Sequence, residues 1–274
     1  GEDTVDKIGE KGKEYRERKL PNEDALIAIA EIFSIGAENL SPRDIFTTSC
    51  IALLMAAPAR GSELFYLKSD CIELTKDEKG KNQLGLRWFS GKGFGHEVEW
   101  VPECMWDVVK EAVERLQNLS SGARAFAKSV EEKAYFLPCP TDISLNDKLT
   151  REQVSLALGL DVYQFEEYVE VNGDTFVKVG LQTKKGQTLS NQLLKKYGIA
   201  RCHYEVTMAE LNKIVRDRIK VNGFPYVPFK TGDGIKVKWS DALFTQMSNA
   251  FHSIKGTSTT ELWMPTIGTI NEDL

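Results

Sequence analysis

One predicted helix is apolar on almost every side, and this feature most constrains how the chain can fold. Ser41-Pro-Arg-Asp44 is a strong helix start, with a serine N-cap, proline at the first helical position and an acid three residues after the cap. The helix would continue to about Pro58, and its apolar side chains are Ile45, Ile51, Leu53, Leu54 and Met55. A helix without a polar face has to be buried, so we expect the neighbouring segments to enclose it. A chain of 274 residues is long enough to do so.

The segments on either side of this helix predict its enclosure. Before it, an apolar stripe at helical spacing indicates an amphipathic helix from Leu26 to about Gly36. After it, the hydrophobic period changes, and three strands are predicted at residues 71–74, 84–89 and 97–101 with glycine-containing turns between them. Pro102 then opens a helix with an apolar stripe formed by Met105, Val108, Val109, Ala112, Val113 and Leu116. We therefore predict an α+β fold, mostly α, with a three-stranded antiparallel sheet.

Beyond residue 136 the pattern indicates an additional α/β segment. Thr150-x-x-Gln153 and Thr207-x-x-Glu210 are capping boxes, and Asn172-Gly173 predicts a hairpin over 168–179. Further helices are expected at Ser190–Tyr197, from Thr207 to Asn222-Gly223, and at Ser240–Ile254. The layout of a capped helix followed by a hairpin is that of a small winged helix, and the helices at 190–197 and 207–223 could form a second such pair; either could place a helix on DNA.

Charge is unevenly distributed along the chain. The formal net charge is −5, yet residues 178–238 hold 13 basic and 4 acidic side chains, a local balance of +9. Such a stretch can contact a nucleic-acid backbone, although a solvated lysine-rich surface explains it equally well. The candidate DNA-binding residues are Lys184, Lys185, Lys195, Lys196, Arg201, Arg216, Arg218 and Lys220.

Several classes of site and location are disfavoured by the sequence. The five cysteines are odd in number and lack metal-ligand spacing, which indicates neither a disulfide framework nor a zinc site and favours a reducing, cytoplasmic location. No segment is long and apolar enough to predict a membrane span. There is no P-loop, G-x-S-x-G or H-E-x-x-H motif, and we expect neither a metal nor another cofactor.

One ordered set of residues carries a more specific signal. Arg60, Glu63-Leu64, Leu67, Asp70 and Ile72 follow the buried helix, Lys92 lies in the turn between the second and third predicted strands, and Val101-Pro102 leads into the next helix. This set resembles the first half of the catalytic domain of tyrosine recombinases, the phage-integrase family. The resemblance covers about residues 23–118. It implies an integrase-type catalytic core that acts on double-stranded DNA.

The resemblance also implies roles for individual residues. Enzymes of this family cleave DNA by attack of a tyrosine on a phosphodiester, and cationic groups stabilise the charge that develops on the phosphoryl oxygens. Arg60 would be the first arginine of this clamp, Glu63 would orient it, and Lys92 would donate a proton to the leaving oxygen. An ordinary surface ion pair between Arg60 and Glu63, and a solvated turn lysine at position 92, are the alternatives.

The sequence departs from the family pattern in its second half. The three histidines, His96, His203 and His252, form no H-x-x-R motif, and the last tyrosine, Tyr226, has no suitable context for a nucleophile. We therefore expect a piece of a longer recombinase that self-associates on DNA when intact. Its parts would be residues 1–135 from the catalytic domain, a basic insertion at 136–260 and a tail at 261–274. On this hypothesis the piece alone does not cleave DNA.

Two other functions remain open. The chain could be a sequence-specific regulator that binds DNA through the winged-helix-like segment, with Arg60 and Lys92 in structural roles. It could also be a non-catalytic protein-interaction module built on a degenerate integrase core.

Overall fold

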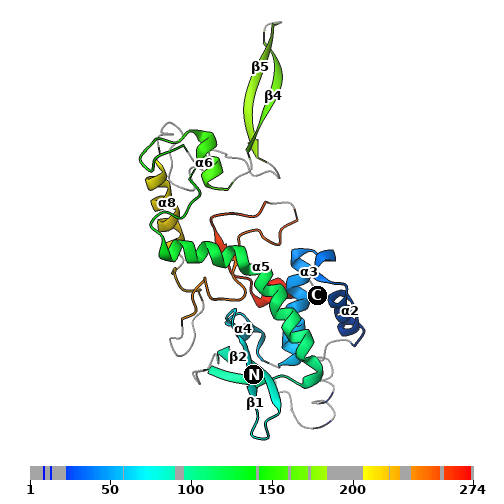
Figure 1. Ribbon diagram of the computed structural model, residues 1–274. Helices are drawn as coiled ribbons and strands as arrows, with labels where there is room; N and C mark the ends of the chain where they lie inside the picture. The colour runs from blue at the N-terminus through cyan, green and yellow to red at the C-terminus, as the bar shows by residue number, and fades with distance from the viewer. Residues whose placement is uncertain are drawn as a thin grey trace, which may run out of the picture.

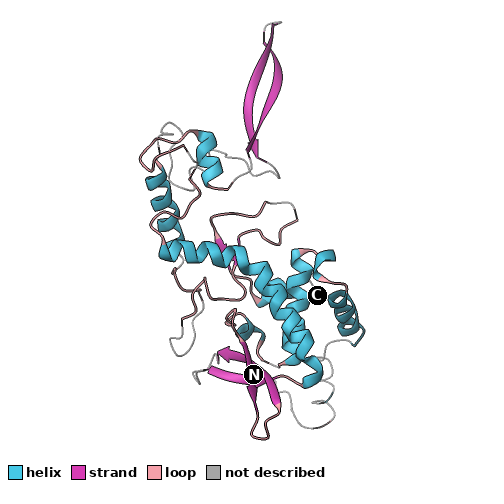
Figure 2. Cartoon of the chain, in the orientation of Figure 1, coloured by secondary structure: helices cyan, strands magenta, loops and turns pink. Residues whose placement is uncertain are grey.

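The architecture was derived from a computed structural model, which describes residues 9, 13, 23–57, 59–89, 96–139, 142–159, 162–171, 174–183, 206–221, 223–228, 236–253 and 256–272. Helices and strands are mixed, and the larger sheet has three antiparallel strands, which confirms the α+β prediction at this level. The three-stranded sheet and a long two-stranded hairpin lie at opposite ends of the molecule, with the helices between them (Figure 2).

The predicted core helix is α3 (Pro42–Ala56), and its start follows the predicted cap. The Asp44 backbone N–H donates to Ser41 Oγ over 3.2 Å, which satisfies one of the unpaired donors of the first turn. Phe46, Cys50 and Leu53 are fully buried, whereas Met55 is half exposed. The prediction of a helix buried on every side therefore holds for most of α3 but not for the side that carries Met55.

Two helices pack against α3, and the three-stranded sheet contributes side chains to the same core. The amphipathic helix α2 (Glu23–Ser34) packs against the outer side of α3, as Figure 1 shows. The predicted meander is β1 (Ile72–Lys76), β2 (Asn82–Phe89) and β3 (His96–Trp100), paired in that order. The long helix α5 (Trp106–Glu132), which follows the short 3-10 helix η2 (Glu103–Met105), crosses α3. The two helices and the sheet all agree with the predictions from hydrophobic period.

Helix α5 joins two hydrophobic cores. Its 27 residues make it about 40 Å long. Near its start, Val109, Ala112, Val113 and Leu116 pack into the core around α3, and near its end Val130 belongs to a second core. The second core contains residues of α6 (Arg151–Ala157), α8 (Met208–Lys220) and the segments beside them, namely Leu137, Leu149, Val154, Ala157, Leu158, Val206, Met208, Leu211, Val215 and Ile219.

The capping boxes predicted for the second half are confirmed. Thr150 accepts from the Gln153 N–H at the start of α6, and Thr207 accepts from the Glu210 N–H at the start of α8. The predicted hairpin is β4 (Val162–Val171) and β5 (Asp174–Thr183), whose register pairs Val171 with Asp174 around Asn172-Gly173. This ribbon extends away from the rest of the molecule in Figure 1. The helix predicted at 190–197 lies outside the described residues.

Buried Asn212 fixes the second core to the end of α5. Its Oδ1 accepts from the backbone N–H groups of Phe136 and Leu137, over 2.8 and 3.0 Å, and its Nδ2 donates to Met208 O. The amide therefore satisfies three backbone groups that would otherwise be costly to bury. An asparagine inside an amphipathic helix gave no such signal in the sequence.

The helix predicted at Ser240–Ile254 is wrong. The described part of this segment contains turns and the short strand β6 (Gln246–Met247), which pairs with β7 (Leu262–Trp263). The helical spacing of its apolar residues is overridden by long-range hydrogen bonds, because the Leu243 N–H donates to Leu67 O over 2.9 Å. Four consecutive residues, Ala242, Leu243, Phe244 and Thr245, are fully buried, which suits a segment inserted into the core rather than an amphipathic helix.

The C-terminal segment is also part of the first core. Phe244 packs edge-on against the rings of Phe46 and Phe65, with centroids 6.1 and 5.2 Å away. Met264 and Ile270, the latter in the short helix α9 (Ile267–Asn271), are buried in the same cluster. Residues 236–272 therefore complete the hydrophobic core that the α3 segment begins.

Candidate functional site

Arg60 lies at the N-terminal end of the one-turn helix α4 (Gly61–Leu64), between α3 and the sheet. Its side chain is 56% exposed, and that of Glu63 is 17% exposed. The Glu63 carboxylate accepts from the Arg60 backbone N–H over 3.3 Å and from its Nη1 over 3.4 Å. The same carboxylate thus contacts both the backbone and the guanidinium of Arg60, an arrangement common to an orienting role and to an ordinary surface ion pair.

The helix that carries Arg60 is anchored on its other sides. Leu64 and Phe65 are buried, and a Cβ on Gly61 would come within 2.7 Å of Ile267 Cδ1 in α9. Glycine at position 61 is therefore what allows α9 to approach so closely. Tyr66 lies on the next turn, and its pKa is raised by burial and by the negative charge of Glu63.

The loop after α4 is pinned by two distant segments. The Ser69 backbone N–H donates to Asp241 O over 2.8 Å, and Gln117 Nε2 of α5 donates to Ser69 O over 2.6 Å. Asp70, which follows this loop, lies 4.0 Å from the Arg87 guanidinium, and Glu73 makes a closer ion pair with Arg87. Arg60 is thus presented on a short helix whose position is set by residues far away in the chain.

Lys92 lies outside the described residues. Its place in the topology is nevertheless defined, because β2 ends at Phe89, β3 begins at His96, and these two residues are partners in the register. Lys92 belongs to the connection between them, as predicted. Lys184, Lys185, Lys195, Lys196 and Arg201 also lie outside the described residues.

The three described basic candidates share helix α8 but have different surroundings. Arg216 donates from Nη1 to Val130 O over 2.5 Å and from Nη2 to the carbonyls of Lys133 and Ala134, so its guanidinium caps the C-terminal end of α5. Lys220 is exposed in the last turn of α8. The third candidate, Arg218, donates through Nε and Nη2 to Glu261 Oε1, over 3.1 and 2.8 Å.

Figure 1 shows α8 beside the C-terminal end of α5, whereas α4 lies beside the three-stranded sheet. The structure therefore brings Arg60 and Glu63 together, and separately places Arg216, Arg218 and Lys220 on α8, where Arg216 and Arg218 contact different segments.

The hairpin β4–β5 carries the wrong charge for contact with phosphates. Its two strands contain four acidic residues, Glu166, Glu167, Glu170 and Asp174, and one basic residue, Lys178. A wing with a balance of 1 − 4 = −3 would be repelled by a nucleic-acid backbone. Of the basic residues of 178–238, Lys178 alone lies on these two strands.

Sequence reasoning missed a groove formed by the C-terminal segment. Two cavities, of about 390 and 370 Å³, share Ser248 and Trp263 as lining residues. The Arg218–Glu261 ion pair lines the first cavity, and Arg43, whose guanidinium lies 3.5 Å from Glu272, lines the second. No sequence motif marks this groove, because its walls come from segments that are far apart in the chain.

Other classes of site were searched within the described residues. No group of three or more side chains among them is arranged to bind a metal ion. No helix in that part of the chain combines the length and apolar character needed to cross a membrane. Comparisons with protein-family models, curated proteins and solved structures find no match to this chain.

Proposed function

We propose that this chain binds double-stranded DNA and supplies Arg60 to the phosphate-binding site of a tyrosine-recombinase-type enzyme. The observation that carries the proposal is the half-exposed Arg60 guanidinium, held by the Glu63 carboxylate at the start of α4. A guanidinium fixed in this way can offer two parallel N–H donors to a phosphate. The order of elements around it, a buried helix, then α4, a three-stranded sheet and a long helix, agrees with the resemblance in the sequence.

The chemistry proposed for this site is phosphoryl transfer. Arg60 would stabilise the negative charge that develops on the phosphoryl oxygens, and Lys92 would give a proton to the leaving 5′ oxygen. The attacking group would be a tyrosine, as in the family that the sequence resembles. Because the chain has no H-x-x-R motif, we expect it to bind DNA without forming a phosphotyrosyl bond by itself.

The proposal is tested first by binding. A fluorescein-labelled duplex of about 30 base pairs would be titrated with the chain at several salt concentrations, and with Arg60→Ala, Arg60→Lys and Glu63→Gln variants. Lys128→Ala is the matched control, because Lys128 is 66% exposed, lies on α5 and also pairs with a carboxylate, that of Glu132. The control removes the same unit of charge.

We expect Arg60→Ala to weaken DNA binding about 5- to 10-fold and to reduce the salt slope by about one phosphate contact, since the guanidinium would neutralise one phosphate. Arg60→Lys and Glu63→Gln should each give an intermediate loss, because they keep the charge at position 60 but not its orientation. Equal affinity of the Arg60→Ala and Lys128→Ala variants at every salt concentration would refute a phosphate-binding role for Arg60.

A second test concerns cleavage. Incubation with a nicked duplex that traps covalent intermediates, followed by denaturing electrophoresis, should leave the protein band unshifted. A DNA-linked band would show that this chain holds a nucleophile, and the proposal that it supplies only part of the site would be wrong.

One observation favours a second candidate function. Helix α6 is followed directly by the hairpin β4–β5, the order found in winged-helix regulators. The acidic balance of the hairpin argues against it as a DNA-contacting wing. Sequence-specific binding that survives Arg60→Ala and is lost on exchange of the α6 surface would favour the regulator.

A further inference from the structure

Helix α2 exposes an apolar surface that nothing among the described residues covers. Eight of its twelve residues are apolar, yet Phe33 alone is buried. Ile27 is 52% exposed and Ile32 38%, and Ile35, immediately after the helix, is 53% exposed. Ala28, Ile32 and Ile35 recur at i, i+4 and i+7 and lie on one side of the helix, and Ile27 lies on the adjoining side, one turn before Glu31. We call these four residues the α2 stripe.

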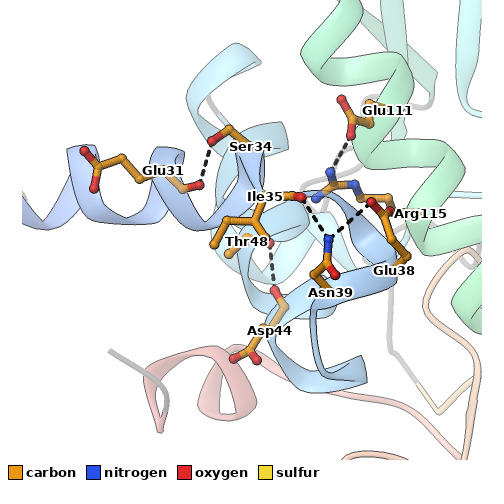
Figure 3. Close-up of polar contacts among 9 residues, drawn as sticks. All are labelled: Glu31, Ser34, Ile35, Glu38, Asn39, Asp44, Thr48, Glu111 and Arg115. Carbon is orange, nitrogen blue, oxygen red and sulfur yellow. Dashed lines mark hydrogen bonds and ion pairs between the residues drawn. The ribbon is translucent and has the colours of Figure 1, made fainter.

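Contacts with the first core fix the orientation of α2. Phe33 inserts toward the first core, where its ring lies 4.1 Å from the guanidinium carbon of Arg115. Arg115 is itself buried and pairs with Glu111 of α5, as Figure 3 shows. The cation, the ring and the packing of α2 on α3 therefore fix which side of α2 faces outward.

Polar contacts also fix the C-terminal end of α2. Ser34 Oγ donates to Glu31 O over 2.7 Å, and Asn39 Nδ2 donates to Ile35 O over 3.4 Å (Figure 3). One carbonyl of the last turn, that of Glu31, is thereby satisfied, and the residue that follows the helix is held by Asn39, so the stripe is carried on a helix with a defined end. A preformed, rigid apolar stripe at the edge of the molecule is typical of a protein-binding surface.

The charges beside the stripe decide between possible occupants. The charged residues of α2 are Glu23, Asp24 and Glu31, and the helix has no basic residue. A second copy packed by two-fold symmetry would place these same acids against the other copy's last turn, where the helix dipole is negative and α2 itself has no basic residue. Charge complementarity therefore disfavours a second copy and favours a partner with basic flanks.

We propose that the α2 stripe is the docking site for an amphipathic helix of another protein, whose apolar residues are flanked by lysine and arginine. The length of α2, about 18 Å, matches about three turns of such a helix. The partner's apolar residues would cover Ile27, Ile32 and Ile35, and its cations would lie near Glu23 and Glu31. This inference does not depend on DNA binding by Arg60.

The test uses two labelled synthetic helices of about 14 residues with the same leucine stripe, one flanked by lysines and the other by glutamates. We expect the lysine-flanked peptide to bind the full chain at least about 10-fold more tightly than the glutamate-flanked one, with the difference shrinking at high salt. Ile27→Lys and Ile35→Lys should each weaken binding of the lysine-flanked peptide about 10-fold.

Leu74→Lys is the matched control, because Leu74 is a 66% exposed apolar residue of β1 and the substitution adds the same charge. It should leave peptide binding unchanged. Circular dichroism should report the same helix content for all three variants, since the replaced side chains are more than half exposed.

Two results would overturn the proposal. Equal binding of both peptides, or binding that is indifferent to Ile27→Lys and Ile35→Lys, would show that the stripe does not select a basic helix. Sedimentation velocity at about 1 to 100 µM should find a monomer; a dimer that Ile27→Lys dissociates would assign the stripe to a second copy instead.

Discussion

Replacing Phe244 by alanine tests whether the C-terminal segment belongs to the core that supports Arg60. The Phe244 side chain is fully buried and packs against the rings of Phe46 and Phe65, with centroids 6.1 and 5.2 Å away. Truncation of a buried phenylalanine costs about 3–5 kcal/mol, and two ring contacts place this site in the upper half of that range. We therefore expect Phe244→Ala to lower the free energy of unfolding by about 4 kcal/mol.

The assay is urea denaturation followed by circular dichroism, supported by thermal melting. A loss of about 4 kcal/mol corresponds to a decrease in Tm of about 8–16 °C for a domain of this size. Val221→Ala is the control, because Val221 is 83% exposed, and it should change stability by less than about 0.5 kcal/mol. The reasoning would be refuted if Phe244→Ala cost less than about 1 kcal/mol, since an alanine there would then leave no cavity beside Phe65.

Four further predictions concern stability and thiol chemistry. Asn212→Leu should destabilise the chain by about 2–4 kcal/mol in urea, because two backbone N–H groups lose their buried acceptor. Arg216→Met should cost about 2 kcal/mol by the same measurement, because three carbonyls at the end of α5 lose a charged donor, and should weaken DNA binding no more than Lys128→Ala does. Burial raises the pKa of Cys71 from 9.0 to about 12. Above pH 9 the folded state therefore binds more protons than the unfolded state, so stability should fall as pH rises from 9 toward 12. This fall should be less steep in Cys71→Ala. In the native protein, a thiol reagent at pH 8 should label the exposed Cys104 and Cys139 and leave Cys71 unmodified until urea is added.

The elements that sequence reasoning predicted correctly are those whose cause is local. The caps at Ser41, Thr150 and Thr207 depend on one side chain and a backbone N–H three residues away. The Asn172-Gly173 hairpin depends on the backbone freedom of two turn residues, and the meander on a hydrophobic period of two. None of these causes requires knowledge of another part of the chain.

The prediction failed where distant segments decide the structure. Residues 240–254 have apolar residues at helical spacing. However, some of their backbone N–H groups donate to distant carbonyls such as that of Leu67, and several consecutive residues are buried. Arg216 likewise gave only the signal of a basic residue on a helix, whereas its partners are carbonyls more than 80 positions earlier. Its guanidinium could be assigned to the end of α5 only once the packing of α8 was known.

The candidate site depends on both a local contact and long-range packing. Arg60 and Glu63 were singled out by the resemblance to tyrosine recombinases, and their contact is made within one turn. Helix α4, however, has only four residues, and a helix of that length is not stable by itself. Its position depends on Ile267 against Gly61 and on Phe244 beneath Phe65, about 180 to 200 positions away. Removing residues 136–260 would therefore also remove Phe244 and the strand β6, and with them part of the support of Arg60. A shortened chain meant to isolate the proposed phosphate-binding site must retain residues 236–272 joined to the α3–α5 core.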